Sequence, residues 1–177
     1  ISDGLLKIDG KITGTGLKEV TKTNILIENF GVKDAPLFTQ ILNATSLVGL
    51  VNTLRGKGIR FQTLRADVDF TPNKIEIKNS FASGTSLGVS TEGAIDRNSD
   101  QISIKGMIVP AYILNRIIDQ IPVVGRILTG GKKEGLLAAE YLISGTRDEP
   151  EVSVNPLTAF TPGFLRAFVK ATRKPLE

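Results

Sequence analysis

Four successive segments of the chain decide its fold: IRFQTLRADVDF (59–70), KIEIKNSFA (74–82), SLGVSTEGAID (86–96) and QISIKGMIV (101–109). In each segment apolar and polar side chains alternate, a period of two that is typical of strands with one buried face. The breaks between them are TPNK (71–74), SGTS (83–86) and RNSD (97–100), which consist mostly of residues that tolerate turn geometry. The economical topology is therefore an antiparallel meander.

The same alternation continues on both sides of this stretch. It precedes it in GLLKIDGKITGTG (4–16) and KTNILIENFG (22–31), and it follows it in GLLAAEYLISG (135–145) and PEVSVN (150–155). The sequence thus predicts about eight strands. Glycine occurs inside three of them, at Gly10, Gly93 and Gly106. Glycine inside a strand often marks a bulge or tight curvature, which a groove needs.

Helical periodicity interrupts the strands. The segment DAPLFTQILNATSLVGLVNTLRGKG (34–58) predicts two short amphipathic helices, with Asp34 and Ser46 as N-caps and Gly56 and Gly58 as stop signals. Further helices are expected in 111–131 and from about Pro162. The predicted fold class is mainly β (α+β): a curved antiparallel meander that forms a groove or half-barrel, with short amphipathic helices inserted, in a single domain spanning 1–177.

Composition excludes several kinds of chemistry. The 177 residues include no His and no Cys, which removes the usual general base, the thiol nucleophile and the imidazole or thiolate metal ligands. Asp67 and Asp69 are two residues apart on one predicted strand, but a pair of acids there is typical of a solvated strand face. The loops SGTSLG (83–88) and LTGGKKEG (128–135) do not complete a phosphate-binding motif. We expect no enzyme activity, no catalytic residue, no cofactor and no metal.

Charge indicates a membrane surface as a better anionic partner than nucleic acid. The formal net charge is +4, but basic and acidic residues are interleaved along most of the chain. Only 6% of residues are aromatic and Trp is absent, which makes base stacking poor, so no nucleic-acid partner is expected.

Two segments are candidates for contact with lipid or membrane. The helical segment 111–128 is apolar on most sides, as in a buried helix or one that faces lipid. The closing segment PGFLRAFVKATRK (162–174) combines apolar and basic side chains, as in an interfacial helix, although its Phe residues could equally pack on the sheet. The candidate contact residues are Ile113, Ile117, Ile121, Phe164, Leu165, Arg166, Phe168 and Lys170.

Five short motifs carry a resemblance to a known family. They are GMIVP at 106–110, IPVVG at 121–125, GGKKEG at 130–135, DEP at 148–150 and NPLTA at 155–159. In this order and spacing they resemble the AsmA-like C-terminal region of YhdP-type and TamB-type bacterial envelope proteins. The resemblance covers about 58–169 well and the first two strands less specifically.

The resemblance implies a function and a location. Such proteins are anchored in the inner membrane of Gram-negative bacteria, and their β-groove domains form a hydrophobic conduit for phospholipid across the periplasm. The expected partner is therefore phospholipid or a membrane surface. The alternative is a structural or chaperone-like module that docks an envelope protein through a strand edge during outer-membrane protein assembly. A continuous apolar groove favours the first function, and a flat, polar-faced sheet with a free edge favours the second.

The ends of the chain suggest a piece of a longer protein. The first residue is Ile1 rather than Met and lies inside a predicted strand, and Leu176–Glu177 is typical of a cloning junction before a purification tag. The oligomeric state cannot be predicted from the sequence.

Overall fold

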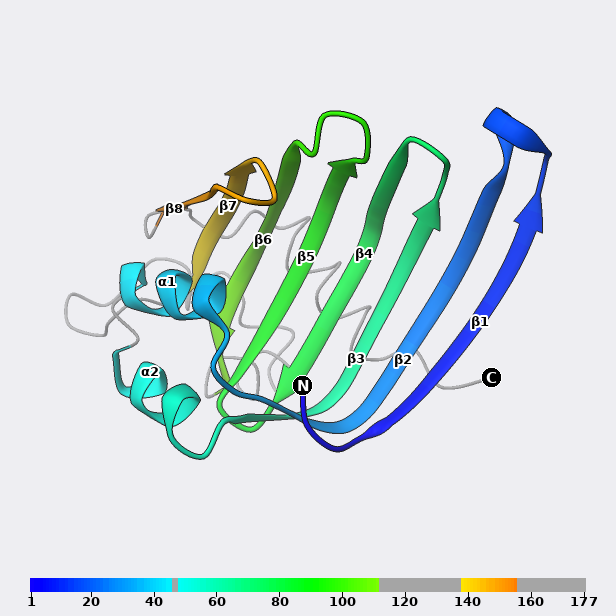
Figure 1. The fold of residues 1–177 in the computed structure, drawn as a ribbon. Coiled ribbons are helices and arrows are strands. Elements are labelled where there is room, and N and C mark those ends of the chain that lie inside the picture. The colour runs from blue at the N-terminus through cyan, green and yellow to red at the C-terminus, as the bar shows by residue number, and fades with distance from the viewer. Residues whose placement is uncertain (46–47, 112–137, 156–177) are drawn as a thin grey trace, which may run out of the picture.

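The computed structural model describes residues 1–45, 48–111 and 138–155, and within these ranges it is an eight-stranded sheet with two short helices (Figure 1). The elements are β1 (Leu5–Thr13), the 3₁₀ turn η1 (Gly16–Lys18), β2 (Val20–Val32), α1 (Pro36–Ala44), α2 (Val48–Arg55), β3 (Ile59–Phe70), β4 (Lys74–Gly84), β5 (Leu87–Asp96), β6 (Ile102–Pro110), β7 (Ala139–Gly145) and β8 (Pro150–Asn155).

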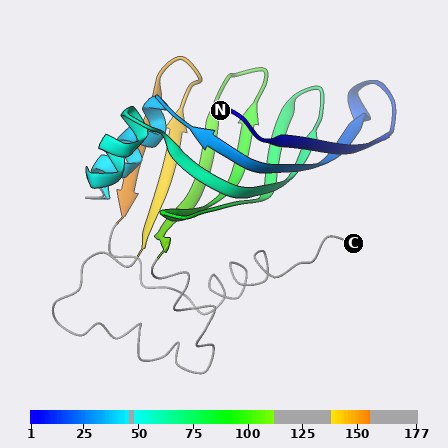
Figure 2. The ribbon, with the colours of Figure 1, turned by 90° about the horizontal axis from the view of Figure 1, so that it is seen from below.

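Every strand pairs antiparallel with its neighbour in the sequence, and the spatial order is β1 to β8. The sheet is strongly curved and stays open, with β1 and β8 at its edges (Figure 2). This confirms the predicted fold class, a curved meander of about eight strands with short helices inserted.

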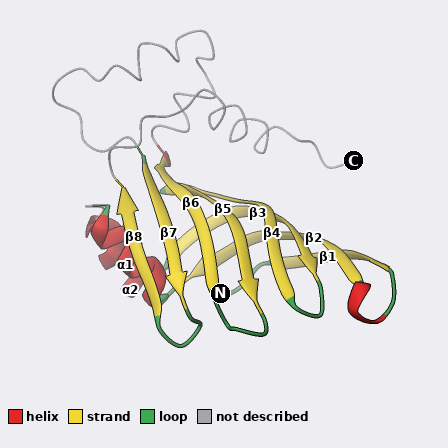
Figure 3. Ribbon diagram, turned by 90° about the horizontal axis from the view of Figure 1, so that it is seen from above, coloured by secondary structure: helices red, strands yellow, loops and turns green. Residues whose placement is uncertain are grey.

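The hairpins that follow β3, β5 and β7 are tied to one another along one side of the sheet (Figure 3). The Arg97 amide donates to the Asn73 carbonyl at 2.8 Å, and the Arg97 guanidinium donates to the Thr71 carbonyl at 3.2 Å. In the next hairpin pair, Arg147 forms an ion pair with Asp100 at 2.5 Å. Polar turn residues therefore connect adjacent hairpins as well as reversing the chain.

The first helix differs from expectation at its N-terminus. Asp34 was predicted as an N-cap, but it adopts a left-handed conformation with φ +49° and lies one residue too early. Ala35 takes the cap position without a side-chain hydrogen bond, and Pro36, whose missing N–H needs no partner there, starts α1. The predicted cap Ser46 lies outside the described residues. Gly58 ends the helical segment as predicted, with φ +81° and its amide bound to the Thr53 carbonyl at 2.8 Å.

The core lies between the helices and one face of the sheet, which we call the inner face. The aromatic rings of Phe30 and Phe61 stack there with centroids 5.2 Å apart, and Phe38 of α1 approaches Phe61 at 6.5 Å. The largest fully buried apolar side chains of this core are Phe30, Leu42, Leu54, Ile59, Leu87 and Ile108. The helices predicted in 111–131 and from Pro162 lie outside the described residues, apart from Ala111.

One of the three strand glycines, Gly93, lies at a bulge. Gly93 pairs with Ile77 beside a register shift, where the two β4 residues Lys78 and Asn79 lie opposite the single β5 residue Glu92. Gly10 and Gly106 lie in uninterrupted register within the curved sheet.

Candidate functional site: the inner face of the sheet

All eight side chains predicted to contact lipid fall outside the described residues: Ile113, Ile117, Ile121, Phe164, Leu165, Arg166, Phe168 and Lys170. The structure therefore brings none of them together. The described residues offer a different candidate surface, the inner face of the curved sheet.

The strand register arranges the inner face in four rows that cross the sheet, because residues paired across neighbouring strands project from the same side. Read from β1 towards β8, the first row is Leu6, Ile27, Leu64, Ala82, Val89, Ile108 and Ala139, and the second row is Ile8, Ile25, Ala66, Ser80, Thr91, Gly106, Tyr141 and Val154. The third row is Gly10, Thr23, Val68, Ile77, Gly93, Ile104, Ile143 and Val152. The fourth row is Ile12, Thr21, Phe70, Ile75, Ile95 and Ile102. Apolar side chains thus run from one edge of the sheet to the other.

The accessibility of this face changes along the sheet. At the β6–β7 end it is buried, with Ile108 1% and Ala139 1% exposed. At the β1 edge it is open, with Ile8 59% and Ile12 65% exposed. The fourth row, which we call the rim row, lies beside the hairpin turns, and its other members are half-buried: Thr21, Phe70, Ile75, Ile95 and Ile102. An apolar surface therefore remains accessible along the hairpin side and the β1 edge.

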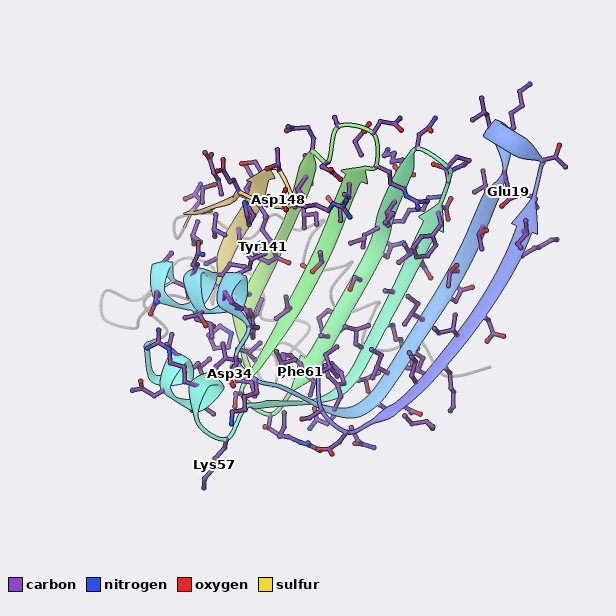
Figure 4. The ribbon with its side chains drawn as sticks, viewed as in Figure 1. Glu19, Asp34, Lys57, Phe61, Tyr141 and Asp148 are labelled. Atoms are coloured by element: carbon purple, nitrogen blue, oxygen red, sulfur yellow. The ribbon has the colours of Figure 1, made fainter. Side chains whose placement is uncertain are left out.

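The helices account for the buried end. Figures 1 and 2 show α1 and α2 beside the β7–β8 end of the sheet, and α1 packs against β8 although it follows β2 in the sequence. In Figure 4, Phe61 lies where β3 begins, on the side of the sheet opposite the hairpin turns, whereas Glu19 and Asp148 lie at the two ends of the hairpin side. The inner face is consequently closed at one end and accessible at the other.

One polar contact is built into the inner face. The Tyr141 side chain crosses Gly106, where a Cβ atom would lie 2.5 Å from the tyrosine oxygen and 1.9 Å from the Ser90 carbonyl. The Tyr141 hydroxyl donates to the Ser90 carbonyl at 2.8 Å, so the hydroxyl of Thr91, at 2.7 Å, must be the donor in the second contact. Burial raises the pKa of Tyr141, which keeps the phenol protonated.

Gly106 is therefore needed for a close approach of Tyr141 to the sheet, which explains its place in the GMIVP motif. Sequence reasoning noticed Gly106 but missed Tyr141 and the rim row. Strand alternation was the signal for the rim row. No local signal pointed to Tyr141, because its partners lie about fifty residues away in the sequence.

The outer face carries ion pairs and polar contacts, while two apolar side chains on the same face, Phe81 and Val109, are buried. Asp69 pairs with Lys78 at 2.5 Å and Glu92 with Lys105 at 3.0 Å, and these hydrogen bonds raise the pKa of both lysines. Asp67 accepts hydrogen bonds from the side-chain amides of Asn24 at 2.7 Å and Asn79 at 3.3 Å. Asp67 and Asp69 thus contribute to a polar strand face, the interpretation that their spacing favoured.

The described ranges contain no group of three or more His, Cys, Asp or Glu side chains placed to hold a metal ion. Within the same ranges, neither helix has the length and apolar character required to cross a bilayer.

Comparisons of the chain with protein-family models, with curated proteins and with solved structures found no match. The AsmA-like resemblance therefore stays a prediction that rests on the sequence motifs.

Proposed function

We propose that this chain is a non-catalytic lipid-handling module that binds phospholipid acyl chains on the inner face of its sheet. It acts on the periplasmic side of the Gram-negative envelope, as part of a larger inner-membrane-anchored protein of the AsmA-like type. There it contributes to phospholipid transport between the two membranes and to the integrity of the outer membrane. No enzymatic step is involved.

The observation that carries the proposal is the apolar character of the inner face across all eight strands, combined with its accessibility at the β1 edge and along the rim row. Acyl chains need a continuous apolar surface, and each methylene removed fully from water contributes about 0.8 kcal/mol. A curved sheet contacts such a chain from more than one side. The polar outer face, with its ion pairs, stays compatible with water.

The test is native mass spectrometry of the purified chain, with lipid extraction from the same sample. We expect phospholipid to copurify at a defined stoichiometry. Ile95→Lys places a charge in the rim row and should abolish lipid binding. Ala94→Lys adds the same charge one residue earlier on the outer face, where the side chain is also half-buried, and should leave binding intact.

Circular dichroism must show that both variants keep their strand content. A wild-type protein that carries no lipid and binds none from vesicles of phosphatidylethanolamine and phosphatidylglycerol would argue against the proposal. Equal lipid binding by both lysine variants would also argue against it.

Among the described strands none pairs with the second side of β1, which favours a second candidate function, docking of an envelope protein by strand addition. The curvature and the apolar inner face favour lipid binding over it. The discriminating result is a lipid-free chain that nevertheless captures an envelope protein and loses it when β1 is altered.

A further inference from the structure

The connection between β2 and β3, which contains both helices, carries most of the net charge of the chain. Residues 33–60 contain four basic residues and a single acid, Asp34, so this segment accounts for +3 of the formal net charge of +4. Neither α1 nor α2 contains an acidic residue. In the rest of the chain basic and acidic residues nearly balance. The connection is therefore basic, whereas the remainder is close to neutral.

Three of these four cations lie together where the connection leaves and rejoins the sheet. The last residue pair between β2 and β3 places Lys33 beside Gly58, where a Cβ atom would lie 3.5 Å from the Cβ of Lys33. Arg55 and Lys57 come just before Gly58, at the end of α2 and in the turn that follows it. The Gly58 amide donates to the Thr53 carbonyl at 2.8 Å, which holds the backbone of this turn. We call Lys33, Arg55 and Lys57 the basic corner.

The side chains of the basic corner are exposed, and none of them forms an ion pair within the described part of the chain. Arg60, the fourth cation of the segment, differs: its guanidinium pairs with Asp3 at 2.9 Å and donates to the Asn29 carbonyl at 3.2 Å. Lys57 projects away from both the helices and the sheet (Figure 4). The charges of the basic corner are thus accessible to a partner of opposite charge.

We propose that the basic corner docks on the surface of a bilayer that contains anionic phospholipid. Phosphate groups at such a surface attract Lys and Arg, and each cation held near it strengthens binding about fivefold. The three cations together therefore contribute about a hundredfold in affinity. A nucleic acid fits less well, because the single aromatic residue of the segment, Phe38, is half-buried against the core and offers no exposed ring for base stacking.

Docking through the basic corner orients the sheet on the membrane. The basic corner lies where β2 ends and β3 begins, whereas the rim row lies beside the hairpin turns at the opposite ends of the strands (Figure 4). On that opposite side the turn between β7 and β8 contains two acids, Asp148 and Glu149, and one base, Arg147. An anionic surface therefore favours the helix side and leaves the rim row accessible. The docking surface is separate from the inner face, so the inference stands whether or not the inner face binds acyl chains.

The test is flotation of the full chain with lipid vesicles. Vesicles of phosphatidylethanolamine and phosphatidylglycerol should bind the chain, and vesicles of phosphatidylcholine alone should bind it at least about tenfold more weakly. Binding to the anionic vesicles should also fall as salt is raised, because salt screens the attraction over about 8 Å at physiological ionic strength.

Two double variants that lose the same number of charges locate the surface. Arg55→Gln/Lys57→Gln removes two cations of the basic corner and should weaken binding to the anionic vesicles about twentyfold. Lys11→Gln/Lys18→Gln removes two exposed cations of the β1–β2 hairpin and should stay within about threefold of the wild type. All four side chains are exposed, so both variants should keep the strand content of the wild type in circular dichroism.

A wild type that binds both kinds of vesicle equally overturns the proposal. Equal weakening in the two double variants also overturns it, since the attraction then follows the net charge and not the basic corner. No weakening in either variant means that another surface docks, which refutes the assignment as well.

Phospholipid that copurifies with each protein separates this inference from the proposed function. Both double variants leave the rim row unchanged and should carry as much lipid as the wild type. Loss of vesicle binding with retained lipid supports the basic corner, whereas a chain that docks through the basic corner but carries no lipid overturns the proposed function alone.

Discussion

Replacing Tyr141 by Phe removes one oxygen from the inner face and tests the polar contact between β7 and β5. The side chain is 3% exposed, and its hydroxyl binds the Ser90 carbonyl at 2.8 Å and the Thr91 hydroxyl at 2.7 Å. Each such hydrogen bond contributes about 0.5–1.5 kcal/mol net, so losing both would lower the unfolding free energy by about 1–3 kcal/mol. Thr91 is half-buried and its hydroxyl can turn towards water, which lowers the expected loss of unfolding free energy to about 1.5 kcal/mol.

The assay is urea denaturation followed by circular dichroism, in which the urea concentration at the midpoint and the slope of the unfolding free energy against urea concentration are fitted separately. Tyr141→Phe should lower the midpoint and leave the slope unchanged, because the ring still covers Gly106 and the packing is retained. A double-mutant cycle with Thr91→Val isolates the contact between the two hydroxyls, for which we expect a coupling free energy of about 0.5–1 kcal/mol.

A loss below about 0.5 kcal/mol for Tyr141→Phe would show that the hydroxyl gains nothing from its buried position. A coupling free energy of zero would show that Thr91 and Tyr141 do not interact. A changed slope would instead mean that the substitution alters the compactness of the folded or unfolded state, so that the shift in midpoint would not measure the hydrogen bonds alone.

Three further predictions concern single positions. Gly93→Ala should destabilise the fold by about 2 kcal/mol or more, because φ is +139° and the new Cβ would lie 2.1 Å from the Ser103 carbonyl; a midpoint equal to the wild type in urea would refute this. Asp96 accepts hydrogen bonds from the backbone amides of Ser99 and Asn98, which lower the pKa of its carboxyl from the ordinary value of 3.8. The stabilisation is therefore present above pH 3.8 and is lost as the pH falls through the pKa of the folded protein. Asp96→Asn should make the unfolding free energy fall less steeply in acid, and an unchanged dependence on pH would contradict the prediction. The buried phenol of Tyr141 should ionise above pH 10.0 in an absorbance titration of the Tyr112→Phe protein, in which Tyr141 is the sole tyrosine. Any stability that the phenol contributes is present below pH 10.0 and is lost as the pH rises through the pKa of the folded protein. Ionisation at or below pH 10.0 would contradict its burial.

The order and type of the strands followed directly from the sequence. Alternation of apolar and polar side chains is a local property, and it indicates each of the eight strands by a period of two bounded by turn residues. A meander also needs only neighbouring strands to pair, so sequence order predicts spatial order. Helix termini were less predictable, because capping depends on backbone angles: the left-handed conformation of Asp34 moved the cap to Ala35.

What the tertiary structure alone decided is which part of the apolar face stays accessible. Ile12 and Ile108 look alike in the sequence, yet one is 65% and the other 1% exposed, because the strand at one edge of the sheet lacks a neighbour and the helices cover the opposite end. The same holds for Gly106, whose role depends on a tyrosine that reaches it only through the pairing of β6 with β7. Periodicity determines which side chains share a face, whereas exposure and close approach depend on how the whole sheet curves and pairs.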